Sequence, residues 1–270
     1  MSDTAPLQGR RALVTGSVQG IGLAIAEAMA RQRADIVLHG LATPAQAQEA
    51  RRGMLEAGAP RVHVLTHDLR EPAQVEAMMQ EALAAGPVDI LVNNAGIQHT
   101  APLADMPRAK WDDIIAINLS AAFDTMRLAL PHMAQRGYGR VVNIASVHGL
   151  VASIHKAPYV AAKFGLVGMS RVAALEYAGA GSRATGGVTV NCICPGWTET
   201  AIIQPQIDAR AQALGVPRDE AIRDLLREKQ PSGRTSLPSE IARLVSWLCE
   251  PAAHNLTGVA IPVDGGWTAQ

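Results

Sequence analysis

Short apolar runs alternate with helical patterns along almost the whole chain, and this alternation constrains the fold more than any single motif. The runs lie at residues 12–15, 34–40, 61–66, 90–93, 140–144, 188–193 and 259–263. Most are nearly continuous in apolar side chains, as expected of parallel strands that are buried on both faces. Because parallel strands are joined by right-handed crossovers that carry helices, the pattern predicts an α/β fold with a doubly wound, parallel seven-stranded sheet and helices on both faces.

Helical periodicity fills most intervals between these runs. The predicted helices are residues 21–33, 44–57, 72–85, 110–135, 158–177 and 238–248. Two segments break the alternation. Residues 178–187 are small and flexible, which indicates an exposed loop. Residues 198–234 are too long for a simple connection and have helical periodicity around 222–226, and a long insertion usually shapes or covers a site. We therefore expect a single domain over 1–270, with a helical substrate lid at about 198–234.

Composition excludes several classes of protein. Lys and Arg together number 24, as do Asp and Glu, so the formal net charge is zero and no bulk positive field favours nucleic acid. We also expect no membrane-spanning helix, which needs about 18 or more apolar residues. Three cysteines are too few for a disulfide framework and suit a reducing compartment, which predicts a cytoplasmic protein. His63 and His67 are four apart in a strand-like run, where they would not share a helix face, so no metal site is predicted.

A glycine-rich turn follows the first predicted strand. Residues 15–22 read TGSVQGIG, and a helix begins directly after them. Glycine lets the backbone turn tightly and approach a pyrophosphate, whose charge meets the free N–H groups of a helix N-terminus. The spacing is G-x-x-x-G-x-G rather than G-x-G-x-x-G, and a purely structural turn is the alternative. Its position in a Rossmann-like sheet favours a dinucleotide, as does the sequence NNAG at 93–96, which ends the fourth strand at the ligand-binding edge.

Four polar residues form a candidate catalytic set. Tyr159 and Lys163 are four apart in a predicted helix, so both project from one face. An ammonium beside a tyrosine favours the phenolate and can bring it into range as a general base. Ser146 follows the fifth strand, where it can hydrogen-bond an alcohol or carbonyl oxygen, and Asn118 lies within the long helix before that strand. Each alone is commonly a solvated or locally bonded residue, but the combination favours catalysis.

Together these motifs resemble the full motif set of the short-chain dehydrogenase/reductase family, from Arg10 to the C-terminus. The resemblance implies that Tyr159 is the acid/base, that Lys163 lowers its pKa and holds the nicotinamide ribose, and that Ser146 orients the substrate oxygen. It further implies a proton relay supported by Asn118, and a homotetramer. The residues that it implies for cofactor binding are Thr15, Gly16, Ser17, Gln19, Gly20, Ile21, Gly22, Asp68 (to the adenine), Leu69, Asn94, Ala95, Gly96, Tyr159, Lys163, Pro195, Gly196 and Trp197.

The end of the second predicted strand bears on the choice of cofactor. A 2′-phosphate would need an Arg or Lys there or inside the glycine turn. The strand ends at His39, Gly40 and Leu41 and the turn offers no cation. The acidic residue that commonly holds the ribose hydroxyls is also missing, since Asp35 lies too early in the strand. The missing cation favours NAD.

Within the family, the chain most closely resembles the bacterial D-3-hydroxybutyrate dehydrogenases. The resemblance is carried by Lys156 and by residues 96–100, 146–152, 194–197, 228–232 and 263–269. It implies a small-molecule hydroxy acid substrate, with (R)-3-hydroxybutyrate oxidised reversibly to acetoacetate with NAD. The implied substrate contacts are Gln98, His148, Lys156 and Gln206 to the carboxylate, Ser146 and Tyr159 to the hydroxyl, and Trp197 and Trp267 on the apolar side.

Two alternatives stay open. One is another member of the family, such as a 3-oxoacyl or steroid reductase, which would have an apolar pocket without Lys156 beside Gln98. The other is a nucleotide-sensing protein that binds the cofactor without turnover. Such a protein would not need an intact set of Asn118, Ser146, Tyr159 and Lys163.

Overall fold

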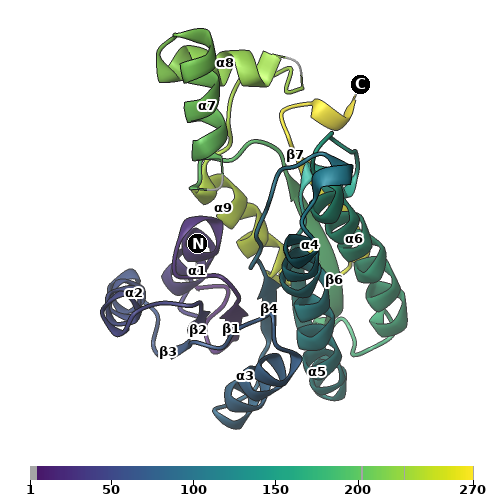
Figure 1. The fold of residues 1–270 in the computed structure, drawn as a ribbon. Helices are drawn as coiled ribbons and strands as arrows, with labels where there is room; N and C mark the ends of the chain where they lie inside the picture. The colour runs from purple at the N-terminus through teal and green to yellow at the C-terminus, as the bar shows by residue number, and fades with distance from the viewer. Residues whose placement is uncertain (1–4, 202, 228, 270) are drawn as a thin grey trace.

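A seven-stranded parallel sheet forms the centre of the computed structural model, which describes residues 5–201, 203–227 and 229–269 (Figure 1). The strands lie in the spatial order β3-β2-β1-β4-β5-β6-β7, and every neighbouring pair is parallel. The order reverses between β1 and β4, the kind of switch point at which doubly wound sheets bind ligands. The predicted fold class is confirmed. The strands are β1 Arg11–Val14, β2 Asp35–His39, β3 Val62–Leu65, β4 Ile90–Asn93, β5 Tyr138–Ile144, β6 Gly187–Pro195 and β7 Ala260–Val263.

Two strands extend beyond their predicted limits because neighbouring strands continue to pair with them. β5 begins at Tyr138, which lies opposite Gly187 in β6. At its other end, β6 continues to Pro195, which lies opposite Val263 in β7. A proline is tolerated at such a position because the strand ends there. The long β6 carries the chain to the edge of the sheet at which Gly196 and Trp197 follow.

Helices cover both faces of the sheet (Figure 1). α1, α2 and α9 pack on one face in a cluster that includes Val14, whereas α3, α5 and α6 pack on the other in a cluster that includes Leu13. Successive side chains of a strand point to opposite faces, so neighbouring residues of β1 enter different cores. The helices are α1 Gly20–Arg31, α2 Pro44–Ala57, α3 Pro72–Ala84, α4 Arg108–Ile115, α5 Ala121–Arg136, α6 Ala157–Tyr177, α7 Gln204–Leu214, α8 Arg218–Arg227 and α9 Pro238–Leu248.

The regular helix predicted for residues 110–135 is interrupted. α4 ends at Ile115, the π-helical segment Ala116–Ser120 follows, and α5 begins at Ala121. A π-bulge inserts one residue into a helix and occurs often at functional sites, but apolar periodicity does not reveal it. Asn118 lies in this segment and is buried.

The helical run from residue 108 to residue 136 resembles a membrane-spanning helix in length and composition, which was not expected from the sequence. By length and composition alone, the 29-residue run Arg108–Arg136 could cross a membrane, because an 18-residue window within it has a mean hydropathy of 1.2. In the structure, Met126, Leu130 and Met133 of α5 lie in the hydrophobic core on one face of the sheet.

In the described part of 198–234, α7 and α8 stand apart from the layers that cover the sheet, at the top of the view in Figure 1. The predicted helical periodicity at 222–226 falls in α8, whereas α7 was not singled out. The guanidinium of Arg210 in α7 pairs with Asp224 in α8. Ile207 and Leu226 are buried, so each helix contributes an apolar side chain to its packing.

Candidate active site

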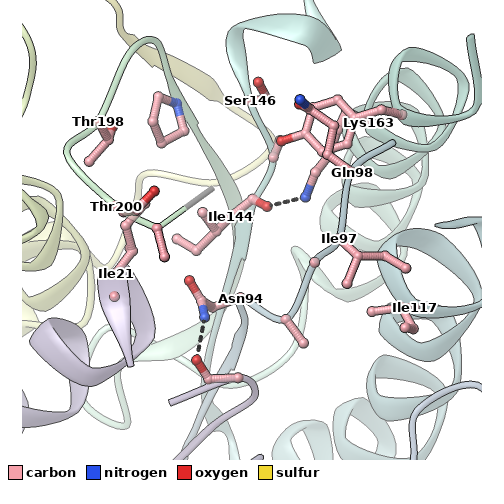
Figure 2. Close-up of a pocket in the computed structure, with 18 of the residues that line it drawn as sticks. Ile21, Asn94, Ile97, Gln98, Ile117, Ile144, Ser146, Lys163, Thr198 and Thr200 are labelled. Atoms are coloured by element: carbon pink, nitrogen blue, oxygen red, sulfur yellow. Dashed lines mark hydrogen bonds between the residues drawn. The ribbon is translucent and has the colours of Figure 1, made fainter. Parts of the chain in front are cut away.

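A cavity of about 410 Å³ opens at the carboxyl ends of the central strands (Figure 2). Its wall combines the glycine turn, the ends of β4, β5 and β6, the start of α6, one residue of α7 and Trp267. Most of the predicted site residues lie on this wall. They are Gly16, Gln19, Gly20, Ile21, Asp68, Leu69, Asn94, Ala95, Gly96, Gln98, Ser146, His148, Lys156, Tyr159, Lys163, Pro195, Gly196, Trp197, Gln206 and Trp267.

Three predicted cofactor contacts lie behind the wall instead. Thr15 Oγ1 accepts hydrogen bonds from the amides of Asn94 and Ala95, at 3.0 and 3.1 Å. Ser17 Oγ donates to the carbonyl of Val14 at 2.7 Å and is fully buried. At Gly22, a Cβ would lie 2.3 Å from the carbonyl oxygen of Gly16. Thr15 and Ser17 shape the turn because their short hydroxyl groups hydrogen-bond to the nearby backbone. Gly22 shapes it by leaving room for the carbonyl of Gly16.

The glycine turn is fixed from two sides. The Asn94 side-chain amide donates to the carbonyls of Thr15 and Gly16 at 2.9 and 3.0 Å (Figure 2). On the other side, His39 Nδ1 accepts a hydrogen bond from the amide of Gly16 at 3.3 Å. Burial lowers the pKa of His39, which keeps the ring neutral and able to accept.

The N-terminus of α1 faces the cavity through Gln19, Gly20 and Ile21. The first N–H groups of a helix have no intrahelical partner, and here no side chain caps them and no acidic residue lies in the first turn. Gly16 has φ 63, so the backbone turns without a side chain in the way. This cradle fits the pyrophosphate of a dinucleotide.

Lys163 of α6 is tied to the end of β5. Its Nζ donates a 2.8 Å hydrogen bond to the carbonyl of Ile144, as Figure 2 shows, and lies 5.6 Å from the centre of the Tyr159 ring. The ammonium is buried, and burial lowers its pKa to about 8. Its position next to the tyrosine agrees with the predicted pairing of the two side chains on one helix face.

The direction of the Tyr159 pKa differs from the expectation. The resemblance implied that Lys163 lowers it, but burial raises the pKa of Tyr159, and the hydrogen bond with Ser146 opposes this only in part. Taking a phenolate out of water is costly, and the Lys163 ammonium is already engaged with the Ile144 carbonyl. The phenol is therefore protonated at neutral pH.

Asn118 lies off the main cavity, beside a separate void of about 10 Å³. Its Oδ1 accepts from the amide of Ile97 and its Nδ2 donates to the carbonyl of the same residue, both at 2.9 Å. Ile97 precedes Gln98, so the asparagine fixes the backbone that carries one of the predicted substrate contacts.

The cavity has one positively charged end. Burial lowers the pKa of Lys156 to about 8, so the side chain is a cation at neutral pH. His148 is buried, and burial together with Lys156 and Lys229 lowers its pKa to about 3, so the imidazole is neutral. Its ring meets those of Tyr159 and Trp267 edge-on, with centroids 5.9 and 5.5 Å apart. Among the described residues its Nε2 has no hydrogen-bond partner.

Several wall residues were not predicted. Val18, Gly40 and Leu41 line the cavity near the end of β2, and Thr198 and Thr200 line it after β6 (Figure 2). The threonines directly follow Pro195 and Gly196 at the carboxyl edge of the sheet, so their position in the sequence offered a signal. The sequence offered no signal that Val18 would line the cavity, because its position depends on the close packing of its side chain against Gly40.

A sequence model of the family described as short chain dehydrogenase matches residues 10–211. The chain belongs to this family. A D-beta-hydroxybutyrate dehydrogenase from Cupriavidus necator is 49% identical over 266 residues, covering 98% of this chain and 100% of that protein. A D-beta-hydroxybutyrate dehydrogenase from Rhizobium meliloti is 41% identical, covering 97% of this chain and 99% of that protein. The predicted family is confirmed, and the chain is an oxidoreductase.

Solved structures of the short-chain dehydrogenase family share the whole fold. A gluconate 5-dehydrogenase from Burkholderia cenocepacia, in complex with NADP and tartrate, has a TM-score of 0.86 and 33% identity, covering 99% of this chain and 98% of that one. A 3-oxoacyl (acyl-carrier-protein) reductase from Agrobacterium tumefaciens, with NADP bound, has a TM-score of 0.86 and 32% identity, covering 98% of this chain and 96% of that one. The family and these neighbours indicate a nicotinamide cofactor.

Proposed function

We propose that this short-chain dehydrogenase oxidises (R)-3-hydroxybutyrate to acetoacetate with NAD, and catalyses the reverse reaction. One observation carries the proposal: a single cavity joins the alcohol chemistry of Tyr159 and Ser146 to a positively charged end at Lys156. The names of the two hydroxybutyrate dehydrogenase relatives support it.

At the alcohol end, Tyr159 takes the proton of the substrate hydroxyl and Ser146 hydrogen-bonds the same oxygen. When bound, NAD supplies the acceptor for the hydride that leaves C3. Lys163 holds the nicotinamide ribose and keeps a positive charge beside the tyrosine, where a cation favours the phenolate that forms when the proton leaves. Asn118 positions the loop of Gln98 through Ile97.

At the other end, Lys156 binds the substrate carboxylate together with neutral donors. A charge-assisted hydrogen bond contributes about 1.5–3 kcal/mol, enough to offset part of the cost of removing a carboxylate from water. His148 is neutral and its Nε2 is free of partners among the described residues, so it can donate to the anion without adding charge. Gln98 and Gln206 line the same cavity, and Trp197 and Trp267 form its apolar side.

NAD is favoured over NADP by what surrounds the end of β2. His39, Gly40 and Leu41 line the cavity there with Val18, and none is a cation. Among the described wall residues the cations are Lys156 and Lys163, which serve the substrate and the ribose. Arg70 lies near Asp68, with which it is paired. Among the described residues around the end of β2, a 2′-phosphate would therefore meet no unpaired cation.

The segment 198–234 is proposed to cover the bound substrate. Gln206 of α7 lines the cavity, whereas most of α7 and α8 stands clear of the sheet (Figure 1). Long insertions at the mouth of a site commonly close over the substrate and exclude water.

The test is an assay of NADH absorbance with both enantiomers of 3-hydroxybutyrate and with the methyl ester of the R form, each with NAD and NADP. We expect turnover of the R acid with NAD, and much lower kcat/KM for the S acid, the ester and NADP. Equal kcat/KM for acid and ester would contradict carboxylate recognition and favour a 3-oxoacyl or other reductase of the family.

A further inference from the structure

A second lysine ammonium lies next to the positively charged end of the cavity. Lys229 follows shortly after α8 ends at Arg227, and its Nζ donates to the hydroxyl of Ser153 at 3.0 Å. The same Nζ lies 5.3 Å from the centre of the Trp267 ring. Trp267 lines the cavity and Ser153 belongs to the loop that leads to Lys156, so three segments that are distant in the sequence meet at this nitrogen.

The charge of Lys229 reaches the substrate site. It is a cause, after burial, of the lowered pKa of Lys156, and it also contributes to the lowered pKa of His148. No carboxylate among the described residues offsets this effect on Lys156. The hydrogen-bond partner of Lys229 is a neutral hydroxyl, which leaves its positive charge in place.

Two like charges near one end of a cavity repel each other until an anion enters. The strength of this repulsion falls with the distance between the charges and with screening by water. A carboxylate at this end is attracted by both ammonium groups, and this attraction offsets their mutual repulsion. The benefit is specific to anions, because a neutral ligand leaves the repulsion unchanged.

We propose that Lys229 is a specificity-determining residue of this enzyme: held against Ser153 and the cavity residue Trp267, it supplies a second positive charge at this end of the cavity and so selects substrates with an anionic end. Lys229 acts as a positioning residue through the field at Lys156 and through its contacts with Ser153 and Trp267. The inference rests on the proposed function in that it takes the anion to be the substrate carboxylate.

The alternative is a purely structural role, in which Lys229 only fastens the segment after α8 to Ser153. The two roles differ in their dependence on ligand charge. Loss of a purely structural role would affect the binding of charged and uncharged ligands alike. Ser153→Ala, which removes the hydroxyl that Lys229 contacts, would then have the same effect as Lys229→Gln. A charge role affects anions only, and an arginine at position 229 would preserve it.

The experiment compares Lys229→Gln, Lys229→Arg and Ser153→Ala with the unmodified enzyme. For Lys229→Gln we expect KM for 3-hydroxybutyrate to rise about three- to tenfold at neutral pH, since a tenfold change corresponds to about 1.4 kcal/mol. We expect kcat to stay within about twofold and kinetics on the methyl ester to be unchanged. Lys229→Arg and Ser153→Ala keep the charge and are expected to retain most of the affinity for the acid.

The pH profile supplies a readout that a structural role would not move. The titratable groups around Lys156 at this end of the cavity are Lys229, His148 and Tyr159, with exposed His155 beside it in the chain. Removing the Lys229 charge raises the pKa of Lys156, because one of its two causes of lowering is gone. The pH above which KM for the acid rises should therefore move upward in Lys229→Gln and stay in place in Lys229→Arg.

A binding measurement separates this inference from the proposed function. Calorimetric titration of acetate, and of acetamide as its uncharged isostere, onto the enzyme saturated with NADH requires no turnover. Weaker acetate binding in Lys229→Gln with unchanged acetamide binding supports the inference, even if the enzyme does not oxidise 3-hydroxybutyrate. Acetate binding that is indifferent to Lys229, or equal losses on acid and ester, would overturn it while leaving the proposed reaction intact.

Discussion

Asn118 pairs both of its side-chain amide atoms with the backbone of Ile97, accepting from N and donating to O at 2.9 Å each. The asparagine is buried in the π-helical segment Ala116–Ser120, and Ile97 lies between the end of β4 and Gln98. The π-helical segment thus fixes the loop of Ile97 and Gln98, which forms part of the cavity wall.

Asn118→Ala should lower both stability and turnover. It leaves the N–H and C=O of Ile97 without these partners, and an unsatisfied buried group costs about 1–3 kcal/mol. We expect a lower Tm and a reduced kcat/KM, measured by thermal unfolding and by NADH absorbance. Ser120→Ala, an exposed change in the same segment, is the matched control. An unchanged Tm with strongly reduced kcat would point to a role in proton transfer alone.

Tyr159→Phe should remove nearly all turnover while cofactor binding is kept. The change deletes the hydroxyl that exchanges the proton and preserves the ring that meets His148 edge-on. We expect kcat to fall about 10²–10⁴-fold, the range typical of a general acid or base. Tyr177→Phe, the same change at the far end of α6, is the control. Near-normal turnover in Tyr159→Phe, with NADH binding measured by fluorescence, would contradict the assignment.

The sequence predicted the sheet and most of the cavity wall because the motifs lie at strand ends, and the carboxyl ends of parallel strands meet at one edge. It did not predict that the Ser17 hydroxyl turns toward the backbone, where it donates to the carbonyl of Val14, because short hydroxyl side chains readily bond to the local backbone. Nor could the sequence give the direction in which the pKa of Tyr159 is shifted, because that direction depends on how far burial outweighs the hydrogen bond with Ser146.

Residues that are distant in the sequence were harder still to predict. Ser153, Lys229 and Trp267 are brought together only by the path of the segment after α8 and the C-terminal turn. The motif around Lys229 had suggested a family resemblance but no role for its charge. No periodicity reveals that its ammonium contacts Ser153 and Trp267.

Affinity for the substrate carboxylate should fall at alkaline pH. The pKa of Lys156 is lowered by burial and by Lys229 to about 8, so the side chain is charged below that pH and neutral above it. KM for 3-hydroxybutyrate should be flat below about pH 8 and rise above it. Lys163 also titrates at about 8, but it acts on the chemistry of any alcohol. The ratio of kcat/KM for the acid to that for its methyl ester therefore isolates Lys156, and a pH-independent ratio would contradict the prediction.

Lys156→Ala should weaken use of the acid selectively. Loss of a charge-assisted hydrogen bond of about 1.5–3 kcal/mol lowers kcat/KM for 3-hydroxybutyrate by about one to two orders of magnitude. Gln98→Ala, which removes a neutral donor from the same cavity, should cost less. Kinetics on the methyl ester should change little in either variant. Equal losses on acid and ester would mean that Lys156 acts on the fold or on the chemistry.

Leu41→Arg should move cofactor preference toward NADP. Leu41 lines the cavity near the end of β2 and is 66% exposed, so the substitution disturbs little packing. Gly40 is the poorer site, because a Cβ there would lie 2.7 Å from a methyl group of Val18. The new guanidinium can pair with a 2′-phosphate, and a contribution of about 1.5–3 kcal/mol corresponds to a tenfold or larger gain in kcat/KM for NADP.

The matched control is Leu41→Gln, which offers a polar side chain without charge. NAD kinetics should change little in both variants, because NAD has no phosphate at that position. The NADP gain in Leu41→Arg should shrink as ionic strength rises, since exposed charges are screened within about 10 Å at 0.1 M salt. Equal NADP kinetics in the two variants would show that the 2′-phosphate lies elsewhere, and the basis for NAD preference would then have to be sought outside the end of β2.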